Sequence, residues 1–321
     1  MMKTAREGLM FAAFGALLLS GTVLTGPAFA ADQDKDPPLE EYMSADSPPE
    51  FDTPEQAVEA FKTTVTGGDF DKLAQLLGLD AAKAKASDGA TDNFAAIETG
   101  VKEKVVLEDQ DKAKVLEIGN QLWPLPFPLV KTEGGKWVFD TYAGLEEIAN
   151  RRVGENEIST IDTVRAYVDA QEDYASEDRD GDGVLEYAQK LISSDRTHDG
   201  LYWPSEQGDG DESPAGPALV DGNALEKAKA GLGYNGYRYR ILTGQGENVA
   251  GGKFDYIING NMIAGFGLVA WPVKYGFTGV KTFVVNKAGV VYEADLGDHT
   301  SGVAEKIRTF NPGDKWSVVS E

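Results

Sequence analysis

The sequence predicts an α+β protein in two parts, a small α+β unit followed by a long amphipathic helix packed on an antiparallel β-meander. Three observations lead to this prediction. A capped helix near residue 53 precedes segments in which apolar and polar residues alternate. In mid-chain, apolar residues recur at spacings of three and four. Beyond residue 236, β-branched and aromatic residues fill short segments separated by turns rich in glycine and asparagine.

The chain opens with the layout of a cleavable secretory signal. Lys3 and Arg6 precede an apolar run, and Ala28 and Ala30 supply the small side chains that a signal peptidase accommodates. The alternative is a permanent anchor, which needs about 20 apolar residues to cross the hydrocarbon core; this run is shorter. We therefore expect residues 1–30 to be removed, no membrane span to remain, and the protein to be periplasmic or secreted.

The mature chain is strongly acidic and has no cysteine. Without its first 30 residues it retains 28 basic and 52 acidic side chains, a net charge of −24. Such a field repels nucleic acid and anionic lipid and attracts cations, which argues against nucleic acid as a partner. The length suggests two domains, and domains above about 100 residues bury enough apolar surface to fold without disulfides.

The mature chain is expected to begin with a disordered leader and to become ordered near Phe51. Residues 31–50 are rich in Asp, Glu and Pro, which predicts a disordered leader. Residues 51–144 are expected to form the small α+β unit, whose first helix begins with Thr53 as N-cap and Pro54 at the first helical position. We predict a further helix at 70–77, an irregular stretch at 81–91, and strands at 101–106, 113–118, 127–132 and 136–140, the last two joined by a Gly134–Gly135 turn.

Residues 145–321 are expected to form the second domain. Its apolar stripe starts at Leu145 and predicts a long helix that ends before Asp178. The polar face of that helix is expected to expose Asp162, Arg165, Asp169, Gln171 and Glu172. We predict strands at 237–242, 254–258, 262–271, 281–285 and 290–293, a tight turn at 259–261, and a final helix at 303–309.

An aspartate-rich loop follows the long helix. Its spacing is that of a calcium loop of the D-x-D-x-D-G kind, with Gly183 at the sixth position. Calcium takes six to eight oxygen ligands, and carboxylates at alternate positions of a tight loop converge on one point. The predicted calcium ligands are Asp178, Asp180, Asp182, the carbonyl of Val184, and Glu186.

The calcium loop is incomplete at its twelfth position. A bidentate Glu is expected there, but this chain has Gln189, so a bound ion would be held more weakly or completed from elsewhere. The alternative is a hydrated acidic turn whose aspartates accept hydrogen bonds from backbone amides. Extracellular modules bind calcium with affinities of about 0.1–1 mM, so an incomplete loop can still fill outside the cytoplasm.

Four segments carry a resemblance to a known family. They are Gly200–Pro204, Gly236–Leu242, Gly265–Pro272 and Thr278–Asn286. Together they closely resemble the bacterial domain of unknown function 2950 family. Because the name of this family assigns no activity, the resemblance implies no catalytic residues.

Two looser resemblances concern the fold. The capped first helix, Gly68–Asp69 and a closing hairpin with Trp137–Asp140 resemble cystatin-like or NTF2-like bacterial domains. The order of long helix, variable loop, Gly-Tyr-x-Tyr strand, Ala-x-Pro strand and Thr-Gly hairpin resembles the globular heads of type IV pilin-like proteins. Arg151 and Arg152 stand where a pilin would continue its apolar helix, so the pilin resemblance implies a shared head fold without polymerisation.

Catalytic constellations are scarce in this sequence. His198 and Asp199 are adjacent, but no serine lies in a nucleophile-elbow context, and neither His198 nor His299 has a second histidine at zinc-ligand spacing. Carboxylates are so numerous that a glycosidase-type pair is neither located nor excluded.

Aromatic residues offer a second candidate surface. Tyr202, Trp203, Trp271 and Tyr275 could form a face for a glycan or peptide. Alternatively, Trp203 and Trp271 seal the helix against the sheet. The tryptophans of the first unit, Trp123 and Trp137, are interpreted as core residues.

These observations lead to two functional hypotheses. We expect an exported, non-catalytic envelope protein that binds or docks to a surface partner, a protein or a glycan, with calcium ordering the loop between helix and meander. The alternative is a hydrolase of cell-wall glycan or peptide that uses Asp or Glu carboxylates. A cleft with convergent carboxylates would favour the hydrolase, and calcium-dependent melting would favour the metal loop.

Overall fold

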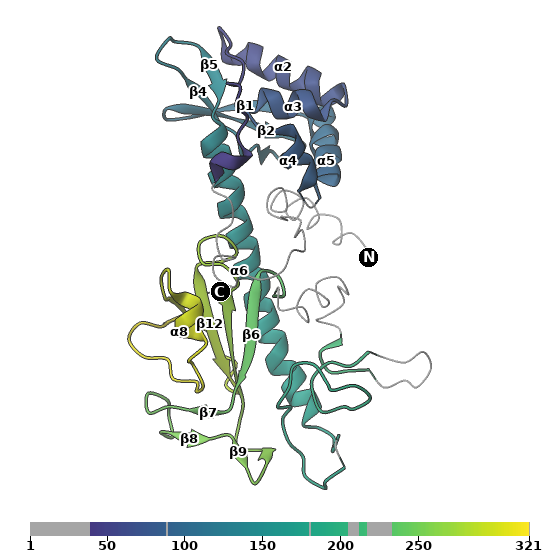
Figure 1. The fold of residues 1–321 in the computed structure, drawn as a ribbon, viewed down its shortest axis with the longest axis vertical. Helices are drawn as coiled ribbons and strands as arrows, with labels where there is room; N and C mark the ends of the chain where they lie inside the picture. The colour runs from purple at the N-terminus through teal and green to yellow at the C-terminus, as the bar shows by residue number, and fades with distance from the viewer. Residues whose placement is uncertain (1–38, 88, 180, 205–211, 217–232, 321) are drawn as a thin grey trace, which may run out of the picture. The chain divides into compact units, whose positions relative to one another are not determined.

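The computed structural model describes residues 39–87, 89–179, 181–204, 212–216 and 233–320. The predicted signal, residues 1–30, lies outside these ranges, as does the start of the leader. The chain divides into two compact units, Met1–Arg152 and Val153–Glu321, which we describe separately (Figure 1). Both units mix helices with antiparallel strands, which confirms the α+β class. Within the described ranges, no helix combines the length and apolar character needed to span a bilayer.

Unit 1 packs short helices against a small antiparallel sheet. Its helices are the 3-10 helix η1 (Leu39–Tyr42), α2 (Pro54–Thr66), α3 (Phe70–Leu76), α4 (Ala81–Ala86) and α5 (Ala90–Glu103). Its strands are β1 (Val105–Gln110), β2 (Ala113–Ile118), β3 (Trp123–Pro124), β4 (Leu129–Lys131) and β5 (Trp137–Phe139). They pair in the order β1-β2-β4-β5, with β3 also on β2. The core between the layers includes Phe61, Leu116, Phe127, Leu129 and Phe139.

Local capping explains where the helices of unit 1 begin. The Thr53 hydroxyl accepts the backbone N–H of Gln56 at 3.3 Å, with Pro54 first in the helix, as predicted. Asp80 caps α4 by accepting two backbone amides, at 3.0 and 3.1 Å. This cap and the alanine-rich sequence make residues 81–86 helical, so the prediction of an irregular stretch there is wrong.

Two further predictions for unit 1 need correction. The strand expected at 101–106 begins only at Val105, because α5 continues to Glu103. Residues 39–50 are ordered, contrary to the predicted leader: Tyr42 is buried, and its carbonyl accepts the N–H of Asp80 at 2.9 Å. The buried Tyr42 ring stabilises the folded segment, although the acidic, proline-rich composition favours disorder. Trp123 is buried and Trp137 packs against the core, which confirms both as core residues.

Unit 2 consists of a long helix, a five-stranded sheet and two small hairpins. Helix α6 (Thr141–Tyr174) begins in unit 1, continues through unit 2 and ends before Asp178, as predicted. The strands are β6 (Tyr237–Leu242), β7 (Gly244–Gln245), β8 (Phe254–Asp255), β9 (Ile257–Ile258), β10 (Asn261–Met262), β11 (Gly267–Pro272), β12 (Lys281–Asn286), β13 (Tyr292–Asp295) and β14 (Ser317–Val318), with helix α8 (Thr300–Ala304). The main sheet has the antiparallel order β14-β13-β12-β11-β6, while β7 pairs with β8 and β9 with β10.

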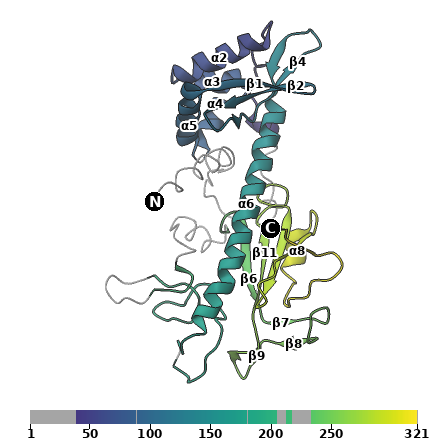
Figure 2. The same cartoon turned by 180° about the vertical axis from the view of Figure 1, so that it is seen from behind.

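The main sheet of unit 2 is covered on both faces. Helix α6 lies along one face (Figure 2), where Tyr167 donates its hydroxyl hydrogen to the Gly267 carbonyl at 3.0 Å. Glu157 of the same helix accepts the amides of Val280 and Lys281 at 2.8 and 2.9 Å. The other face packs beneath α8, with a separate core that contains Trp271, Ala304 and Phe310. The sheet is therefore the middle layer of unit 2.

Two strands and one helix of unit 2 differ from the prediction. The strands expected at 254–258 and 262–271 are both interrupted, the second by Gly265, whose φ of +147° does not fit a strand. The final helix lies at 300–304 instead of 303–309. Residues 308–310 run beside β7 instead, where the Phe310 N–H donates to the Gly244 carbonyl at 2.9 Å.

Gln171 was expected to be exposed on the polar face of the helix, and this prediction is wrong. Its side chain is fully buried. It accepts the Ala188 N–H at 2.8 Å and donates to the Ala188 carbonyl at 2.9 Å and to the Tyr167 hydroxyl at 3.0 Å. A buried amide is stable when its hydrogen-bonding groups find partners, and here they fix the chain that returns from the aspartate-rich loop onto α6.

Candidate functional site

The acidic loop, which we define as residues 178–189, is shaped by its own aspartates. Asp178 accepts the Gly181 N–H at 2.8 Å with one oxygen and the Gly183 N–H at 2.9 Å with the other. Asp182 accepts the Val184 N–H at 2.8 Å. Gly181 and Gly183 have φ values of +79° and +86°, which non-glycine residues rarely adopt. Backbone capping by aspartates, the alternative interpretation of the sequence, is therefore present in this loop.

The acidic loop is joined to the hairpin formed by β9 and β10, which turns through Asn259 and Gly260 with φ values of +53° and +99°. Positive φ at both turn residues is typical of a tight two-residue hairpin and confirms the predicted turn. Four hydrogen bonds form what we call the loop–hairpin seam. Donor first, they are Asn261 Nδ2 to Asp182 Oδ2 (2.6 Å), Met262 N to Glu186 Oε2 (2.8 Å), Tyr187 N to the Met262 carbonyl (2.9 Å) and Gln189 Nε2 to the Gly260 carbonyl (2.6 Å).

The seam gives roles to residues that the sequence analysis missed. Gln189, which breaks the calcium pattern at its twelfth position, anchors the loop to the hairpin turn. Asn261, noticed only as part of a turn, holds Asp182. In the sequence, the Asn259–Gly260 turn indicated that a hairpin is present. Its pairing with the acidic loop had no local signal, because the residues bonded across the seam are more than 70 positions apart.

The predicted calcium ligands are only partly assembled by this geometry. Asp180 lies outside the described residues. Among the residues that are described, no three His, Asp or Glu side chains lie together closely enough to hold a metal ion. The donor chemistry suits calcium, since carboxylates and a carbonyl are hard oxygen ligands. Asp182 and Glu186 each use one oxygen in the seam, however, so calcium would share these ligands with the hairpin. The calcium site stays a prediction.

Arg179 of the acidic loop and His198 both pack against Trp203, a core residue of unit 2. The Arg179 side chain is only 9% exposed, and its guanidinium carbon lies 5.4 Å from the Trp203 ring centre and 5.8 Å from that of Tyr174. The His198 imidazole also stacks on Trp203, with ring centres 4.3 Å apart. Trp203 therefore packs against the helix side of unit 2.

The four aromatic residues considered as a glycan face do not form one face. Trp203 belongs to the core on the helix side of the sheet, whereas Trp271 belongs to the core on the opposite side. The proposal that both tryptophans seal the helix against the sheet is therefore correct for Trp203 and wrong for Trp271. Trp271 instead packs under the Arg240 guanidinium, 5.2 Å away, which in turn donates to the carbonyls at the end of α8.

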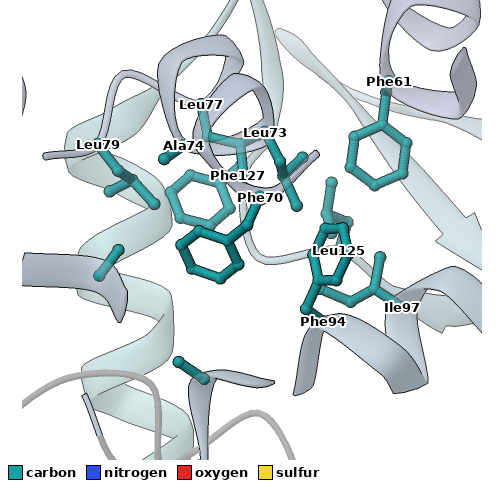
Figure 3. A pocket seen from close by; sticks show the side chains of 12 residues that line it. Phe61, Phe70, Leu73, Ala74, Leu77, Leu79, Phe94, Ile97, Leu125 and Phe127 are labelled. Atoms are coloured by element: carbon teal, nitrogen blue, oxygen red, sulfur yellow. The ribbon is translucent and has the colours of Figure 1, made fainter. Parts of the chain in front are cut away.

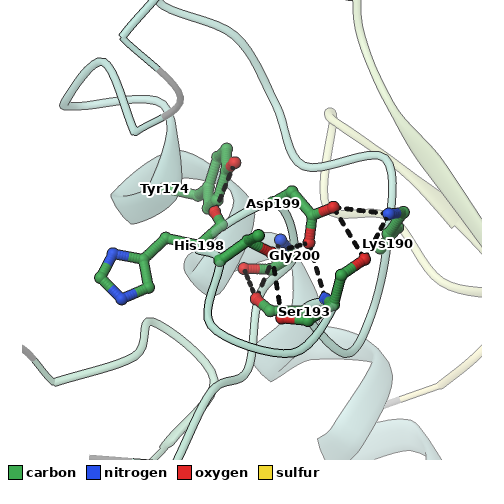
Figure 4. A network of polar contacts seen from close by, with 8 residues as sticks. Tyr174, Lys190, Ser193, His198, Asp199 and Gly200 are labelled. Atoms are coloured by element: carbon green, nitrogen blue, oxygen red, sulfur yellow. Dashed lines mark hydrogen bonds and ion pairs between the residues drawn. The ribbon is translucent and has the colours of Figure 1, made fainter.

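A polar clasp closes the loop that follows the seam (Figure 4). The Asp199 carboxylate accepts from Lys190 Nζ at 2.5 Å, Ser194 N at 2.7 Å and Thr197 Oγ1 at 2.8 Å. Burial raises the pKa of Asp199, but these hydrogen bonds outweigh burial and lower the pKa below its usual value. Asp199 is therefore a structural anion that holds residues 190–199 together.

His198 and Asp199 are not arranged as a catalytic triad. The His198 imidazole points away from Asp199 (Figure 4), so the adjacent pair does not form part of a triad. The Ser194 hydroxyl lies 2.8 Å from Lys190 Nζ, which resembles a serine–lysine pair. Yet the Lys190 side chain is half exposed, and its Nζ also pairs with the Asp199 carboxylate, so its contacts are those of an ion pair that holds the clasp together.

Unit 1 contains an apolar cavity between its helices and the loop before β4 (Figure 3). The cavity has a volume of about 30 Å³. Its lining is apolar throughout and consists of Phe61, Phe70, Leu73, Ala74, Leu77, Leu79, Ala84, Ala90, Phe94, Ile97, Leu125 and Phe127. A water molecule needs two to four polar partners, which this lining does not offer. The cavity also has no carboxylate, so it is not the cleft that a glycan hydrolase would require.

Comparison with known proteins gives one match. A family model described as a protein of unknown function (DUF2950) covers residues 49–319, a range that takes in most of both units and the whole acidic loop. No curated protein and no solved structure matches the chain.

Proposed function

The chain belongs to the DUF2950 family, and because the description of that family names no activity, we propose a function from the structure: an exported, non-catalytic envelope protein that binds a surface partner through its acidic loop and β9–β10 hairpin. The partner is an envelope protein or a glycan. The loop–hairpin seam is the observation that carries this proposal.

The seam supports binding because it holds a surface loop in one conformation. Four hydrogen bonds connect two segments that are far apart in the sequence. Leu185, between the bonded residues Asp182 and Glu186, nevertheless remains 58% exposed. A surface that is ordered before binding loses less conformational entropy when a partner arrives. A fixed loop that presents a large apolar side chain is therefore suited to docking.

Export is supported by the first 30 residues and by the acidic, cysteine-free mature chain. Cell fractionation and N-terminal sequencing of the full-length protein test this part. We expect a mature N-terminus at Ala31 in the periplasm or medium; an uncleaved chain in the cytoplasm would contradict it.

We also propose that calcium binds Asp178, Asp180, Asp182, the Val184 carbonyl and Glu186. Support comes from the spacing of the acids and from a loop that is already bent at Gly181 and Gly183. Bound calcium would tighten the same loop that the seam holds. Calorimetric titration of the mature protein with calcium tests the site directly, and no heat up to several millimolar would count against it.

The finer fold likenesses belong to this proposal as well. We propose that unit 1 is cystatin-like or NTF2-like and that unit 2 resembles a type IV pilin-like head. In support, unit 1 packs α2 on an antiparallel sheet, and unit 2 packs one long helix on the sheet β14-β13-β12-β11-β6. An experimental structure with a different strand order in either sheet would remove the likeness.

The docking proposal is tested by binding labelled mature protein, residues 31–321, to isolated envelopes of the producing bacterium. Wild type and the control Val303→Asp, at another exposed apolar site, on α8, should bind alike. Leu185→Asp should lose most of the binding. Equal binding by all three proteins would contradict a role for the acidic loop.

A further inference from the structure

Three exposed apolar residues neighbour the bonded residues of the loop–hairpin seam. Leu185 is 58% exposed, Ile258 46% and Ile263 43%. Leu185 precedes Glu186 and Ile263 follows Met262, and these two neighbours are bonded to each other. Ile258 pairs directly with Asn261, the residue that holds Asp182. The seam thus holds the two distant segments that carry these three exposed side chains next to each other.

The apolar surface beside the seam is bordered by acidic residues. Glu177, Asp178, Asp182 and Glu186 surround Leu185 in the sequence, and all but the part-buried Glu186 are exposed. The one basic residue among them, Arg179, packs onto Trp203 and Tyr174 and also lies 3.6 Å from the Glu177 carboxylate. The nearest following lysine, Lys190, is paired with Asp199. A third cation, Lys287, contacts the Tyr187 hydroxyl and lies 3.7 Å from Glu172. Among the described residues, each of these three cations is thus already in contact with an acidic or aromatic side chain of unit 2.

We infer that this surface binds a basic, amphipathic segment of a partner protein, with an apolar side chain against Leu185, Ile258 and Ile263 and Lys or Arg side chains near the acidic border. The inference rests on the proposed docking function and names its partner class. Charge complementarity selects the occupant: a net charge of −24 disfavours anionic lipid and a second copy of the mature chain. The small patch implies a weak, salt-sensitive interaction.

The seam is the positioning element of this surface. Asn261 donates to Asp182 at 2.6 Å, and this contact keeps the Leu185 segment beside the Ile258 segment. Asn261→Ala should therefore weaken binding without removing any side chain that meets the partner. Leu185→Ser and Ile258→Ser remove contact directly, and both sites are exposed enough for the protein to fold.

The test uses the mature protein and three synthetic peptides, measured by calorimetry. One peptide alternates Lys and Leu, the second Lys and Ser, and the third Glu and Leu. We expect the Lys–Leu peptide to bind, with the affinity falling about fivefold in Leu185→Ser and in Ile258→Ser, and falling further as salt rises. Val303→Ser, the matched control on α8, should bind like wild type.

Three results would overturn the inference. The first is that the Lys–Ser peptide binds as tightly as the Lys–Leu peptide. The second is that the Lys–Leu peptide binds Leu185→Ser and Ile258→Ser as tightly as it binds wild type. The third is that the Lys–Leu peptide does not bind the wild-type protein. If envelope binding still depends on Leu185 while the Lys–Leu peptide fails to bind, the partner class is wrong and the docking function survives. If neither binding depends on Leu185, both fail.

Discussion

Replacing Gln171 by Leu should destabilise unit 2 more strongly than any exposed change on the same helix. Gln171 is fully buried, and both hydrogen-bonding groups of the Ala188 backbone depend on it. Leucine keeps the side chain large and leaves no sizeable cavity, but it leaves the Ala188 N–H and carbonyl buried without these partners. Each unsatisfied buried group costs about 1–3 kcal/mol, so for the two groups we expect a loss of about 2–6 kcal/mol in the free energy of unfolding.

Urea unfolding followed by tryptophan fluorescence measures the stability lost in Gln171→Leu, and amide hydrogen exchange reports the Ala188 N–H directly. Asp169→Leu, at an exposed position of α6, is the control and should change the free energy of unfolding by less than about 0.5 kcal/mol. In Gln171→Leu the Ala188 amide should exchange much faster. A loss below 1 kcal/mol with an unchanged exchange rate would refute the role of Gln171 as the anchor of this segment.

Three further predictions concern pH, calcium and packing. Hydrogen bonds hold the folded pKa of Asp199 below its unfolded value of 3.8. The stability that Asp199 contributes is therefore present above about pH 4 and is lost as the pH falls below that value. Asp199→Asn should flatten this part of the acid-unfolding curve, and an unchanged curve would refute the prediction. If calcium binds with a dissociation constant of about 1 mM, 10 mM calcium should raise the Tm of the mature protein by about 3–5 °C. This shift in Tm should vanish in Asp178→Asn but persist in the control Glu177→Gln. Identical melting curves in EDTA and in calcium would contradict calcium binding. Gly279→Ala should lower Tm by several degrees, because the added Cβ would lie 2.0 Å from the Tyr237 hydroxyl oxygen; a wild-type melt would show that this loop adjusts freely.

Much of the fold follows from local sequence signals, and the exceptions depend on distant contacts. The start of α2 is predictable because Thr53 and Pro54 act within one helical turn. Gln171 lies at helical spacing from the buried Tyr167 and Tyr174, so its position in the sequence favoured burial. Its polar side chain led instead to the prediction that it is exposed. The partner that makes its burial stable, Ala188, lies 17 positions further along the chain.

The candidate site could be located from the sequence, but its surroundings could not. Aspartate spacing identified the acidic loop, and the structure shows the local bends and caps that this spacing produces. The seam depends on Asn261 and Met262, which lie more than 70 positions along the chain from their partners Asp182 and Glu186. Likewise, nothing local in the sequence indicated that Trp203 and Trp271 lie on opposite faces of the sheet.

Amide hydrogen exchange at the seam tests the central claim most directly. The Tyr187 and Met262 amides both cross between the acidic loop and the hairpin. We predict that both amides exchange slowly in the mature protein, and that Glu186→Ala speeds exchange at Met262. Rapid exchange at both amides in the wild-type protein would mean that the loop is not fastened to the hairpin, and the proposed binding surface would not exist.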